Sequence, residues 1–290
     1  MEHILEVNNL RKEYPGFTLD NISFKLPRGT ITGLIGPNGA GKTTTIKLMM
    51  NMIKRNAGDI KIFGMDYSKS EKEIKNRIGY VGEEQYFYQN KTVNWTEKFV
   101  SGFFKDWDPV MFSTLISTFS LPLNQKIKKF SKGMKVKLSF AIALSHNPEL
   151  LILDEPTSGL DPVIRREILD LLMELKRKDE LSVFLSSHIT DDLFRISDHI
   201  CYMVNGKIII EEVKDELLAR WKKVVYKPDS LPEGIESILL NVERQLFGSS
   251  GITDKYPEIA GSLSDGIKKG DIRIENVNLD DILISLVTGE

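Results

Sequence analysis

A glycine-rich octapeptide constrains the fold of this chain more than any other feature of its sequence. Gly36-Pro37-Asn38-Gly39-Ala40-Gly41-Lys42-Thr43 fits the pattern G-x-x-x-x-G-K-[ST] and lies between an apolar run, 30–35, and an apolar-periodic segment, 44–53. Its glycines let backbone N–H groups surround phosphate oxygens, and the positive end of a following helix faces the anion. A strand, this loop and a helix in that order predict an α/β protein with a phosphate site.

Two side chains of this loop have the chemistry that a nucleoside triphosphate requires. Lys42 can place a positive charge beside the β- and γ-phosphates, and the Thr43 hydroxyl can bind Mg²⁺. We therefore predict that residues 36–43, together with Thr44, bind the nucleotide and that Lys42 also takes part in catalysis. The alternative, a glycine-rich turn without a ligand, does not explain the flanking strand and helix.

A second polar cluster, Asp154-Glu155, follows the apolar run 150–153. Successive side chains of a strand point to opposite faces, but the backbone turns at the strand's carboxyl end, where ligands of α/β proteins bind. There Asp154 can hold Mg²⁺ through water, and Glu155 can polarise an attacking water. Alone, such a pair is usually a solvated loop start. Its occurrence together with the phosphate loop favours a hydrolytic nucleotide site.

The remaining pattern predicts two regions of different character. Residues 1–215 contain short apolar strands, a mostly helical stretch at about 84–145 and a hairpin turn at Asn205-Gly206. Residues 222–290 are punctuated by proline and glycine and contain weaker segments, with a capped terminal helix at 278–287. We predict strands at 3–8, 17–26, 30–35, 58–63, 78–81, 150–153, 183–186, 201–204 and 207–211, and helices at 44–53 and 164–176.

Charge is unevenly distributed along the chain, although the total of 39 basic and 41 acidic residues is near neutral. A near-neutral total argues against a protein that coats nucleic acid. Residues 21–58 and 109–148 contain twelve basic residues and no acidic one, which leaves 27 basic and 41 acidic residues elsewhere. Two basic segments in an acidic background indicate anionic ligand sites or, in the simpler alternative, solvated faces.

The termini and the single cysteine argue against other classes of protein. Residues 1–11 lack the charged-then-apolar arrangement of a signal peptide, and no stretch approaches the ~18–20 apolar residues of a membrane span. Cys201 lies in an apolar strand and is expected to be a structural thiol, and the four histidines lack the spacing of a structural zinc site. We therefore expect a soluble, intracellular chain.

Together these motifs resemble those of a known family, the ATP-binding subunits of ABC transporters. Residues 154–161 resemble its Walker B motif and D-loop, and Phe130-Ser131-Lys132-Gly133-Met134 lies where the family has its signature motif. Ser187-His188 resembles the switch histidine, and Tyr14 the aromatic residue that stacks on adenine. The resemblance covers about residues 4–215. It implies an α/β fold, a RecA-like P-loop NTPase core with an antiparallel β subdomain and an α-helical subdomain, here followed by a small C-terminal α+β extension.

The resemblance also implies a mechanism. Two such domains pair head to tail, as a homo- or heterodimer, with two ATP molecules and Mg²⁺ between them, and power a separate transmembrane subunit. Ser131 and Gly133 would contact the γ-phosphate held by the other subunit, and His188 would join Glu155 and Lys42 in catalysis. The chain would then act in the cytoplasm, on the inner face of the cell membrane, without nucleic acid. The implied nucleotide contacts further include Tyr14, Glu83 and Asp161, and the implied metal ligands are Thr43, Glu83 and Asp154.

Two departures from the family pattern concern the coupling of the subunits. Lys132 replaces the first glycine and Met134 the glutamine of the usual Leu-Ser-Gly-Gly-Gln signature. Glu83 stands where many relatives have glutamine, and an ionised carboxylate can accept a hydrogen bond from metal-bound water but cannot donate one. These variants, with Asp-Trp-Asp at 106–108, resemble a bacterial exporter-type branch (YtrB-like).

Aromatic residues are concentrated in residues 80–107, which hold nine of the 25 in the chain. The helix-spaced Trp95, Phe99 and Phe103 are predicted to face the core. Tyr86-Phe87-Tyr88 is contiguous, so all three cannot face one core, and exposed aromatic clusters favour a protein interface. In the family this region receives a coupling helix of the membrane subunit, and we predict that these three residues line that socket.

Two other functional classes agree with parts of the pattern. A soluble ABC ATPase of assembly, regulation or chromosome work usually has a coiled-coil insertion or a second ATPase domain, and the sequence shows neither. A regulatory module that has lost catalysis would not need Lys42, Asp154, Glu155 and His188 together. We therefore favour an ATP-hydrolysing transporter subunit, with substrate specificity in the membrane subunit.

Overall fold

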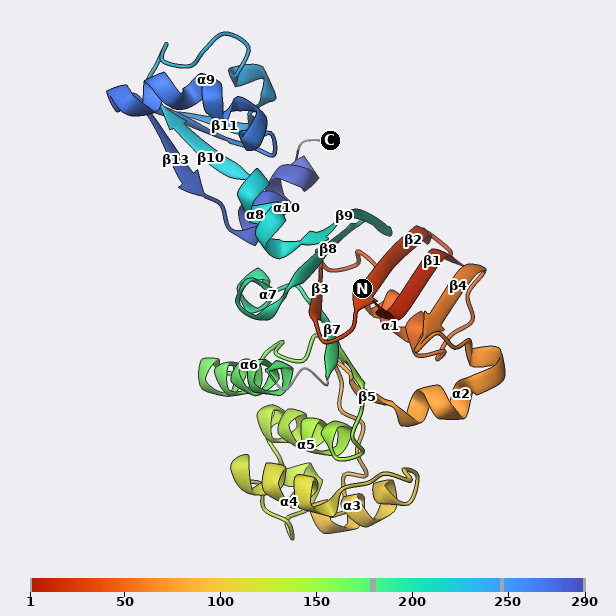
Figure 1. Ribbon diagram of the computed structural model, residues 1–290. Coiled ribbons are helices and arrows are strands. Elements are labelled where there is room, and N and C mark those ends of the chain that lie inside the picture. Colours follow the sequence, from red (N-terminus) through yellow and green to blue (C-terminus); the bar gives the residue numbers. More distant parts are fainter. Residues whose placement is uncertain (1, 178–180, 246–247, 289–290) are drawn as a thin grey trace. The chain divides into compact units, whose positions relative to one another are not determined.

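The computed structural model describes residues 2–177, 181–245 and 248–288 of the 290-residue chain (Figure 1). The chain divides into two compact units, Met1–Glu211 and Glu212–Glu290. The boundary predicted from the sequence, between 215 and 222, lies within the second of these units. All of the sequence motifs named above lie in the first unit.

A six-stranded sheet forms the centre of the first unit. Its strand order is β5-β6-β7-β3-β8-β9, and the pairs from β5 to β8 are parallel. Every residue of β3, β6 and β7 is buried, as expected for a parallel sheet covered on both faces, and Cys201 of β8 is buried as predicted. The strands are β3 (Ile31–Ile35), β5 (Ile78–Val81), β6 (Leu150–Asp154), β7 (Ser182–Ser187), β8 (His199–Val204) and β9 (Lys207–Val213).

The position of β3 in this sheet determines where a ligand can bind. β3 pairs with β7 on one side and with β8 on the other, so it interrupts the otherwise sequential strand order β5-β6-β7-β8-β9. Ligands of open α/β sheets bind beyond the carboxyl ends of the strands at such a point. The phosphate loop follows β3, Asp154-Glu155 ends β6 and His188 follows β7, so one edge of the sheet brings all three together. The predicted α/β core is confirmed.

A three-stranded antiparallel sheet, in the order β2-β1-β4, forms a second part of this unit. It consists of β1 (His3–Tyr14), β2 (Phe17–Pro27) and β4 (Ala57–Ile62), and its apolar side chains share one core with those of the central sheet. Phe24 of β2, for example, stacks on Phe184 of β7 with ring centroids 5.2 Å apart. This sheet is the antiparallel β subdomain expected from the sequence, with β1 longer than the predicted strand 3–8.

The core sheet is accompanied by α1 (Lys42–Met49), α2 (Tyr67–Asn76), α6 (Pro162–Lys176) and α7 (Thr190–Ile196). α1 begins at the end of the phosphate loop but ends at Met49 rather than at the predicted residue 53. Asn51 adopts a left-handed conformation, with φ of 53°, which asparagine tolerates but which cannot continue a helix. α6 begins after Asp161, whose side chain accepts hydrogen bonds from two N–H groups of the first turn.

The region 84–145 is mostly helical, as predicted. It contains α3 (Val93–Ser101), α4 (Pro109–Thr118), the 3₁₀ turn η1 (Ile127–Lys129) and α5 (Lys132–Leu144). Each of the three α-helices starts after a capping side chain that accepts from a backbone N–H of the first turn, which satisfies donors that the helix itself cannot. The capping residues are Thr92, Asp108 and Ser131.

The aromatic residues along α3 show that one prediction was wrong. Trp95 is only partly buried, and Phe99 and Phe103 are 41% and 65% exposed, so these side chains do not form the core. The buried positions of α3 are Val93 and Thr96, and the four-residue spacing of the aromatic residues places them on a different stripe. Their rings pack on one another instead. The ring centroid of Phe99 lies 5.0 Å from that of Trp95 and 5.2 Å from that of Phe103.

The β8–β9 hairpin packs against the phosphate loop. Its turn, Asn205-Gly206, has positive φ angles of 48° and 75°, the conformation favoured by this dipeptide in the predicted hairpin. The Gly206 N–H donates to the Ala40 carbonyl at 3.0 Å. Gly36 packs so closely on β8 that an added Cβ would lie 2.2 Å from the Met203 carbonyl oxygen. The conformation of the loop therefore depends on β8 as well as on β3.

The second unit has its own antiparallel sheet, in the order β11-β12-β10-β13, and its own apolar core, which includes Val224 and Leu263. The predicted terminal helix is present and begins with a reciprocal cap between Asn278 and Asp281. No helix in the described part of the chain is long and apolar enough to span a membrane. The elements are α8 (Lys214–Arg220), β10 (Lys222–Tyr226), η2 (Glu236–Ile238), β11 (Leu240–Gln245), β12 (Gly248–Thr253), α9 (Tyr256–Lys269), β13 (Ile272–Asn276) and α10 (Leu279–Thr288).

Candidate nucleotide site

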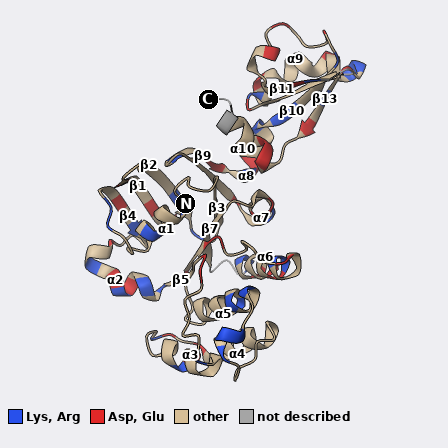
Figure 2. Cartoon of the chain, turned by 180° about the vertical axis from the view of Figure 1, so that it is seen from behind, with Lys and Arg blue, Asp and Glu red and all other residues tan. Residues whose placement is uncertain are grey.

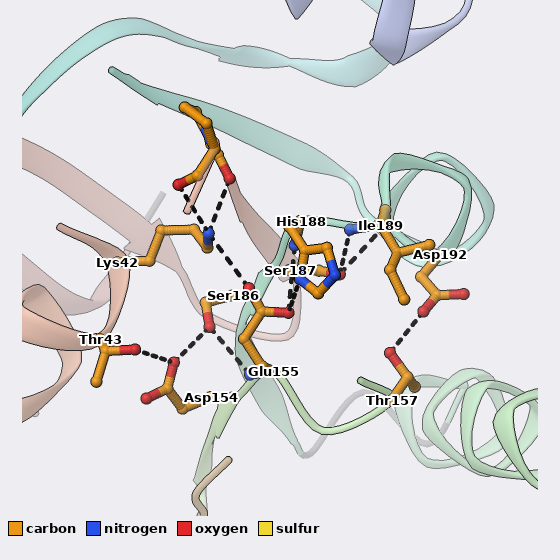
Figure 3. Close-up of polar contacts among 12 residues, drawn as sticks. Lys42, Thr43, Asp154, Glu155, Thr157, Ser186, Ser187, His188, Ile189 and Asp192 are labelled. Carbon is orange, nitrogen blue, oxygen red and sulfur yellow. Dashed lines mark hydrogen bonds and ion pairs between the residues drawn. The ribbon is translucent and has the colours of Figure 1, made fainter. Parts of the chain in front are cut away.

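A cavity of about 560 Å³ is formed by the phosphate loop, the acidic end of β6 and the segment after β7. Figure 3 shows the polar contacts that surround it. Loop backbone and charged side chains make up most of its wall, a lining that suits a ligand carrying phosphate groups. The lining residues are Phe17, Asn38, Gly39, Ala40, Gly41, Lys42, Thr43, Thr44, Glu83, Glu155, Ser158 and His188.

Lys42 is held in a fixed position in this wall. Its side chain is 6% exposed, and Nζ donates to the carbonyls of Gly36 at 2.8 Å and Pro37 at 3.3 Å. Nζ also lies 3.2 Å from Glu155 Oε1. These three acceptors order the lysine side chain before any ligand binds, which lowers the entropy that binding a phosphate must offset.

Asp154 and Thr43 meet beneath the loop. Thr43 Oγ1 donates to Asp154 Oδ1 at 3.2 Å, and Ser186 Oγ donates to the same oxygen at 2.7 Å. The pKa of Asp154 is raised above its usual value, mainly by burial and further by the nearby carboxylates of Glu155 and Glu83. The two hydrogen bonds act in the opposite direction and lower it. A cation beside Asp154 would favour its ionised form.

This pair of oxygen donors fits Mg²⁺. The ion prefers oxygen ligands and usually takes only one or two from the protein, with phosphate and water oxygens completing its shell. No group of three or more His, Cys, Asp or Glu side chains that could hold a metal occurs among the residues described. A hydroxyl and a carboxylate that already contact each other can provide the protein's share.

Glu155 lies between the lysine and the histidine. Its φ of 48° is left-handed, a conformation uncommon for glutamate, and it turns the side chain toward the cavity beside Asp154. Glu155 Oε2 lies 2.7 Å from His188 Nδ1 and accepts from the His188 N–H at 3.3 Å. A carboxylate fixed on one side by an ammonium group and on the other by an imidazole can orient a water molecule and accept its proton.

Tyr14 is not among the residues that line the cavity. Its ring is 41% exposed, and Lys12 Nζ lies 5.2 Å from the ring centroid. Phe17, which is paired with Tyr14 across the turn between β1 and β2, lines the cavity instead. Sequence reasoning missed Phe17 because Tyr14 occupies the position at which the family carries its aromatic residue. Stacking by Tyr14 stays a prediction, and Phe17 is a second candidate.

Ser131, Gly133 and Asp161 do not line this cavity either. Ser131 Oγ accepts from the N–H of Met134, and Asp161 caps α6, so both side chains lie at helix N-termini. Gly133 is buried, and an added Cβ would lie 2.4 Å from Ile164 Cδ1. The structure thus separates the signature segment from the phosphate loop of the same chain.

The two acid-free segments are separated in the same way. The first contributes Lys42 to the cavity, whereas the second contributes none of the lining residues. Its lysines occur near α4 and α5 in Figure 2, where Lys137 pairs with Glu167 of α6 at 2.6 Å. Lys128, Lys129 and Lys132 are exposed. Most lysines of the second segment therefore lie on a solvated face of this chain.

Ser186 is a site residue that the sequence analysis overlooked. Its hydroxyl donates to Asp154 and accepts from the Glu155 N–H at 3.1 Å, so it positions both members of the acidic pair. A signal was available, because Ser186 and Ser187 are polar residues that end an otherwise apolar buried strand. Ser158 also lines the cavity without having been predicted.

The strand order, the loop between β3 and α1, and the acidic end of β6 together define a phosphate-loop nucleoside triphosphatase. Solved structures agree with this class. One described as the structure of an ATP-binding subunit of an ABC transporter has a TM-score of 0.68 and 28% identity over 74% of this chain and 92% of that chain. A nucleotide-free ATP-binding cassette from an ABC transporter has a TM-score of 0.62 and 26% identity over 73% and 92% of the two chains.

Sequence relatives identify the family. The ABC transporter family model matches residues 19–158. The bacitracin transport ATP-binding protein BcrA of Bacillus licheniformis is 32% identical over 100% of this chain and 99% of that protein. The lantibiotic transport ATP-binding protein SrtF of Streptococcus pyogenes is 34% identical over 73% of this chain and 92% of that protein. The chain belongs to the ATP-binding proteins of the ABC transporter family.

Membership in this family makes the chain an ATP-binding and ATP-hydrolysing transport subunit that works with a transmembrane partner. The expected class of protein and its enzymatic activity are confirmed. The finer assignment to a YtrB-like branch stays a prediction.

Proposed function

We propose that this chain binds MgATP in the cavity after β3 and hydrolyses it as one of two motor subunits of an exporter. The observation that carries this proposal is the place of the Glu155 carboxylate, 3.2 Å from Lys42 Nζ and 2.7 Å from His188 Nδ1. A carboxylate beside a phosphate-directed cation and an imidazole is placed to accept the proton of a water that attacks the γ-phosphorus. Lys42 and His188 would then contact the γ-phosphate itself.

The remaining wall of the cavity supplies the binding contacts. Backbone N–H groups of residues 36–44, apart from Pro37, would hold the phosphates, as the start of α1 directs its positive end toward them. Thr43 and Asp154 would hold Mg²⁺, and Glu83 would contact it through water. When bound, Mg²⁺ neutralises negative charge on the transferring phosphoryl group. Tyr14 or Phe17 would stack on the adenine.

We also propose that a second ATPase subunit, identical or related, completes each site head to tail. The signature residues Ser131 and Gly133 lie outside the cavity of their own chain, and so does Asp161. Ser131 caps the N-terminus of the 13-residue helix α5, whose backbone N–H groups and dipole favour an anion. Pairing two chains would bring each α5 to the γ-phosphate held by the other chain.

The names of the relatives support export of a peptide antibiotic. Proteins named for the transport of bacitracin and of a lantibiotic are 32% and 34% identical to this chain. Both names denote peptide compounds, so we propose a substrate of that class. The chain would act at the cytoplasmic face of the membrane, where ATP is supplied.

A phosphate-release assay on the purified chain tests the proposed reaction. We expect phosphate release from MgATP and its loss when EDTA removes the metal, because the two protein oxygens at Thr43 and Asp154 cannot neutralise the phosphates without the ion. Copurification from membranes should recover a transmembrane subunit. If neither the free chain nor that complex hydrolyses ATP, a regulatory module without catalysis is the better interpretation.

A second surface of the first unit fits the membrane partner. Tyr88, Trp95, Phe99 and Phe103 form a continuous series of ring contacts, with centroid separations of 5.4 Å for Tyr88–Trp95 and 5.6 Å for Tyr88–Phe99. Tyr86, beside them in sequence, is 87% exposed. We define these five residues as the aromatic surface and, with Phe87, propose it as the docking site for the transmembrane subunit, since exposed aromatic clusters favour interfaces.

Substitutions in the aromatic surface test this docking. The triple variant Tyr86→Ser, Phe87→Ser, Tyr88→Ser is expected to recover at least about tenfold less membrane subunit in copurification, because aromatic side chains often dominate interface energies. ATP hydrolysis by the free chain should change little. Val110→Ser, at a 70% exposed position of α4, is the control. Unchanged recovery of the membrane subunit with the triple variant would exclude this part of the surface as the docking site.

A further inference from the structure

Asp192 is a buried carboxylate behind the proposed catalytic residues. It lies in the first turn of α7, four residues after His188, and is 2% exposed. Its Oδ2 accepts from Thr157 Oγ1 at 2.6 Å, a contact drawn in Figure 3, and its Oδ1 accepts from Arg165 Nε at 2.6 Å. None of these three residues lines the nucleotide cavity. Both carboxylate oxygens are therefore used for contacts within the protein.

The partners of Asp192 lie at the two ends of one loop. Thr157 is two residues after Glu155, and Arg165 is in the first turn of α6, where its N–H donates to the Asp161 carbonyl at 3.0 Å. The segment 155–161 is thus attached to α7 at its beginning and beyond its end. Both contacts are made to a buried carboxylate, and the donor in one of them is the charged Arg165 guanidinium, so that hydrogen bond is of the strong, charge-assisted kind.

Residues 155–161 and residues 187–192 also contact each other at the cavity. There Glu155 Oε2 contacts His188 Nδ1 at 2.7 Å. Glu155 has an uncommon left-handed φ of 48°, a conformation that persists only where surrounding contacts maintain it. On the carboxyl side of Glu155, Asp192 fixes the hydroxyl of Thr157, two residues further along the loop.

We propose that Asp192 is a positioning residue that holds residues 155–161 and 187–192 as one body and so maintains the Glu155–His188 contact during turnover. The proposal rests on the hydrolytic function proposed for Glu155. It also connects Asp161 to the catalytic pair Glu155–His188. A displacement of residues 155–161 at Asp161, the exposed end of this loop, would move Thr157 and α7 together. Because Asp192 does not face the cavity, its loss should affect turnover much more than ATP binding.

The experiment compares Asp192→Asn with Asp191→Asn, its exposed neighbour on α7. Asparagine keeps the volume but carries no charge and only one acceptor oxygen, so the ion pair with Arg165 is lost and at most one of the two donors keeps its acceptor. We expect kcat to fall about 10- to 100-fold in Asp192→Asn, the range for a displacement of about 1 Å, with the Kd for a fluorescent ATP analogue changed less than about threefold. Asp191→Asn should match the wild type in both.

Thr157→Val provides a second variant that removes only the hydroxyl. We expect it to lower kcat in the same direction, and the double variant with Asp192→Asn to lose less than the product of the two single effects, as for residues that act as a unit. In a Glu155→Gln background, Asp192→Asn should leave the amount of trapped ATP unchanged. A kcat within about twofold of the wild type in both single variants would overturn the proposal, and so would equal losses of ATP binding and turnover. If the wild type itself lacks hydrolysis, the proposed function fails instead.

Discussion

Glu155→Gln is expected to retain ATP, lose at least about 10³-fold in turnover and accumulate an ATP-bound dimer. Glutamine keeps the shape of the side chain but cannot accept a proton from water. The neutral amide can still contact His188 and face Lys42, so the cavity should keep its form. Loss of the negative charge also removes repulsion toward the triphosphate, which favours retention of bound ATP.

Three measurements on one preparation check this expectation: phosphate release, retention of radiolabelled ATP and the mass of the particle in solution with and without MgATP. Glu174→Gln, at an exposed position of α6, is the matched control and should behave like the wild type. Turnover of the Glu155→Gln variant within about tenfold of the wild type would refute the assigned role. Retained ATP in a monomeric particle would support the catalytic role but contradict the dimer.

Lys42→Ala is expected to impair ATP binding, the step before hydrolysis, and to weaken the affinity for ATP by at least about 100-fold. The substitution removes the charge that meets the β- and γ-phosphates. It also leaves Glu155, which is 7% exposed, without its cationic partner and close to the incoming phosphates. An unpaired buried carboxylate beside a polyanion repels it, so binding suffers more than from the loss of one contact.

Titration with a fluorescent ATP analogue measures this effect. Lys47→Ala changes an exposed lysine near the end of the same helix and should leave the affinity unchanged. Turnover at saturating ATP should also fall in Lys42→Ala. Near-normal affinity in Lys42→Ala would mean that the loop N–H groups alone bind the phosphates and that Lys42 holds Glu155 rather than the nucleotide.

Local sequence patterns predicted the parts of this protein in which neighbouring residues determine the outcome. The phosphate loop, the buried run ending at Asp154 and the Asn205-Gly206 turn are each specified within a few residues, because backbone conformation and strand burial are local properties. These features therefore appear where the sequence placed them.

Other features depend on packing between distant segments. The spacing of Trp95, Phe99 and Phe103 is helical, but spacing alone cannot tell a core stripe from an exposed one, and Val93 and Thr96 face the core instead. Asp192 carried no recognisable signal, since its partners Thr157 and Arg165 become neighbours only after α6 and α7 have formed. Contacts between residues so far apart in the sequence can be identified only in the folded structure.

The contacts of the β8–β9 hairpin with the phosphate loop have a consequence for synthesis of the chain. The loop is complete in sequence by Thr43, yet Gly36 rests on Met203 and Ala40 is bonded to Gly206. A growing polypeptide would display the motif long before it emerged as far as these residues. Domains form as units, and contacts between distant residues form late. We therefore expect affinity for the nucleotide to arise only after translation has passed Gly206, which would make ATP a ligand of the finished domain and not of the nascent one.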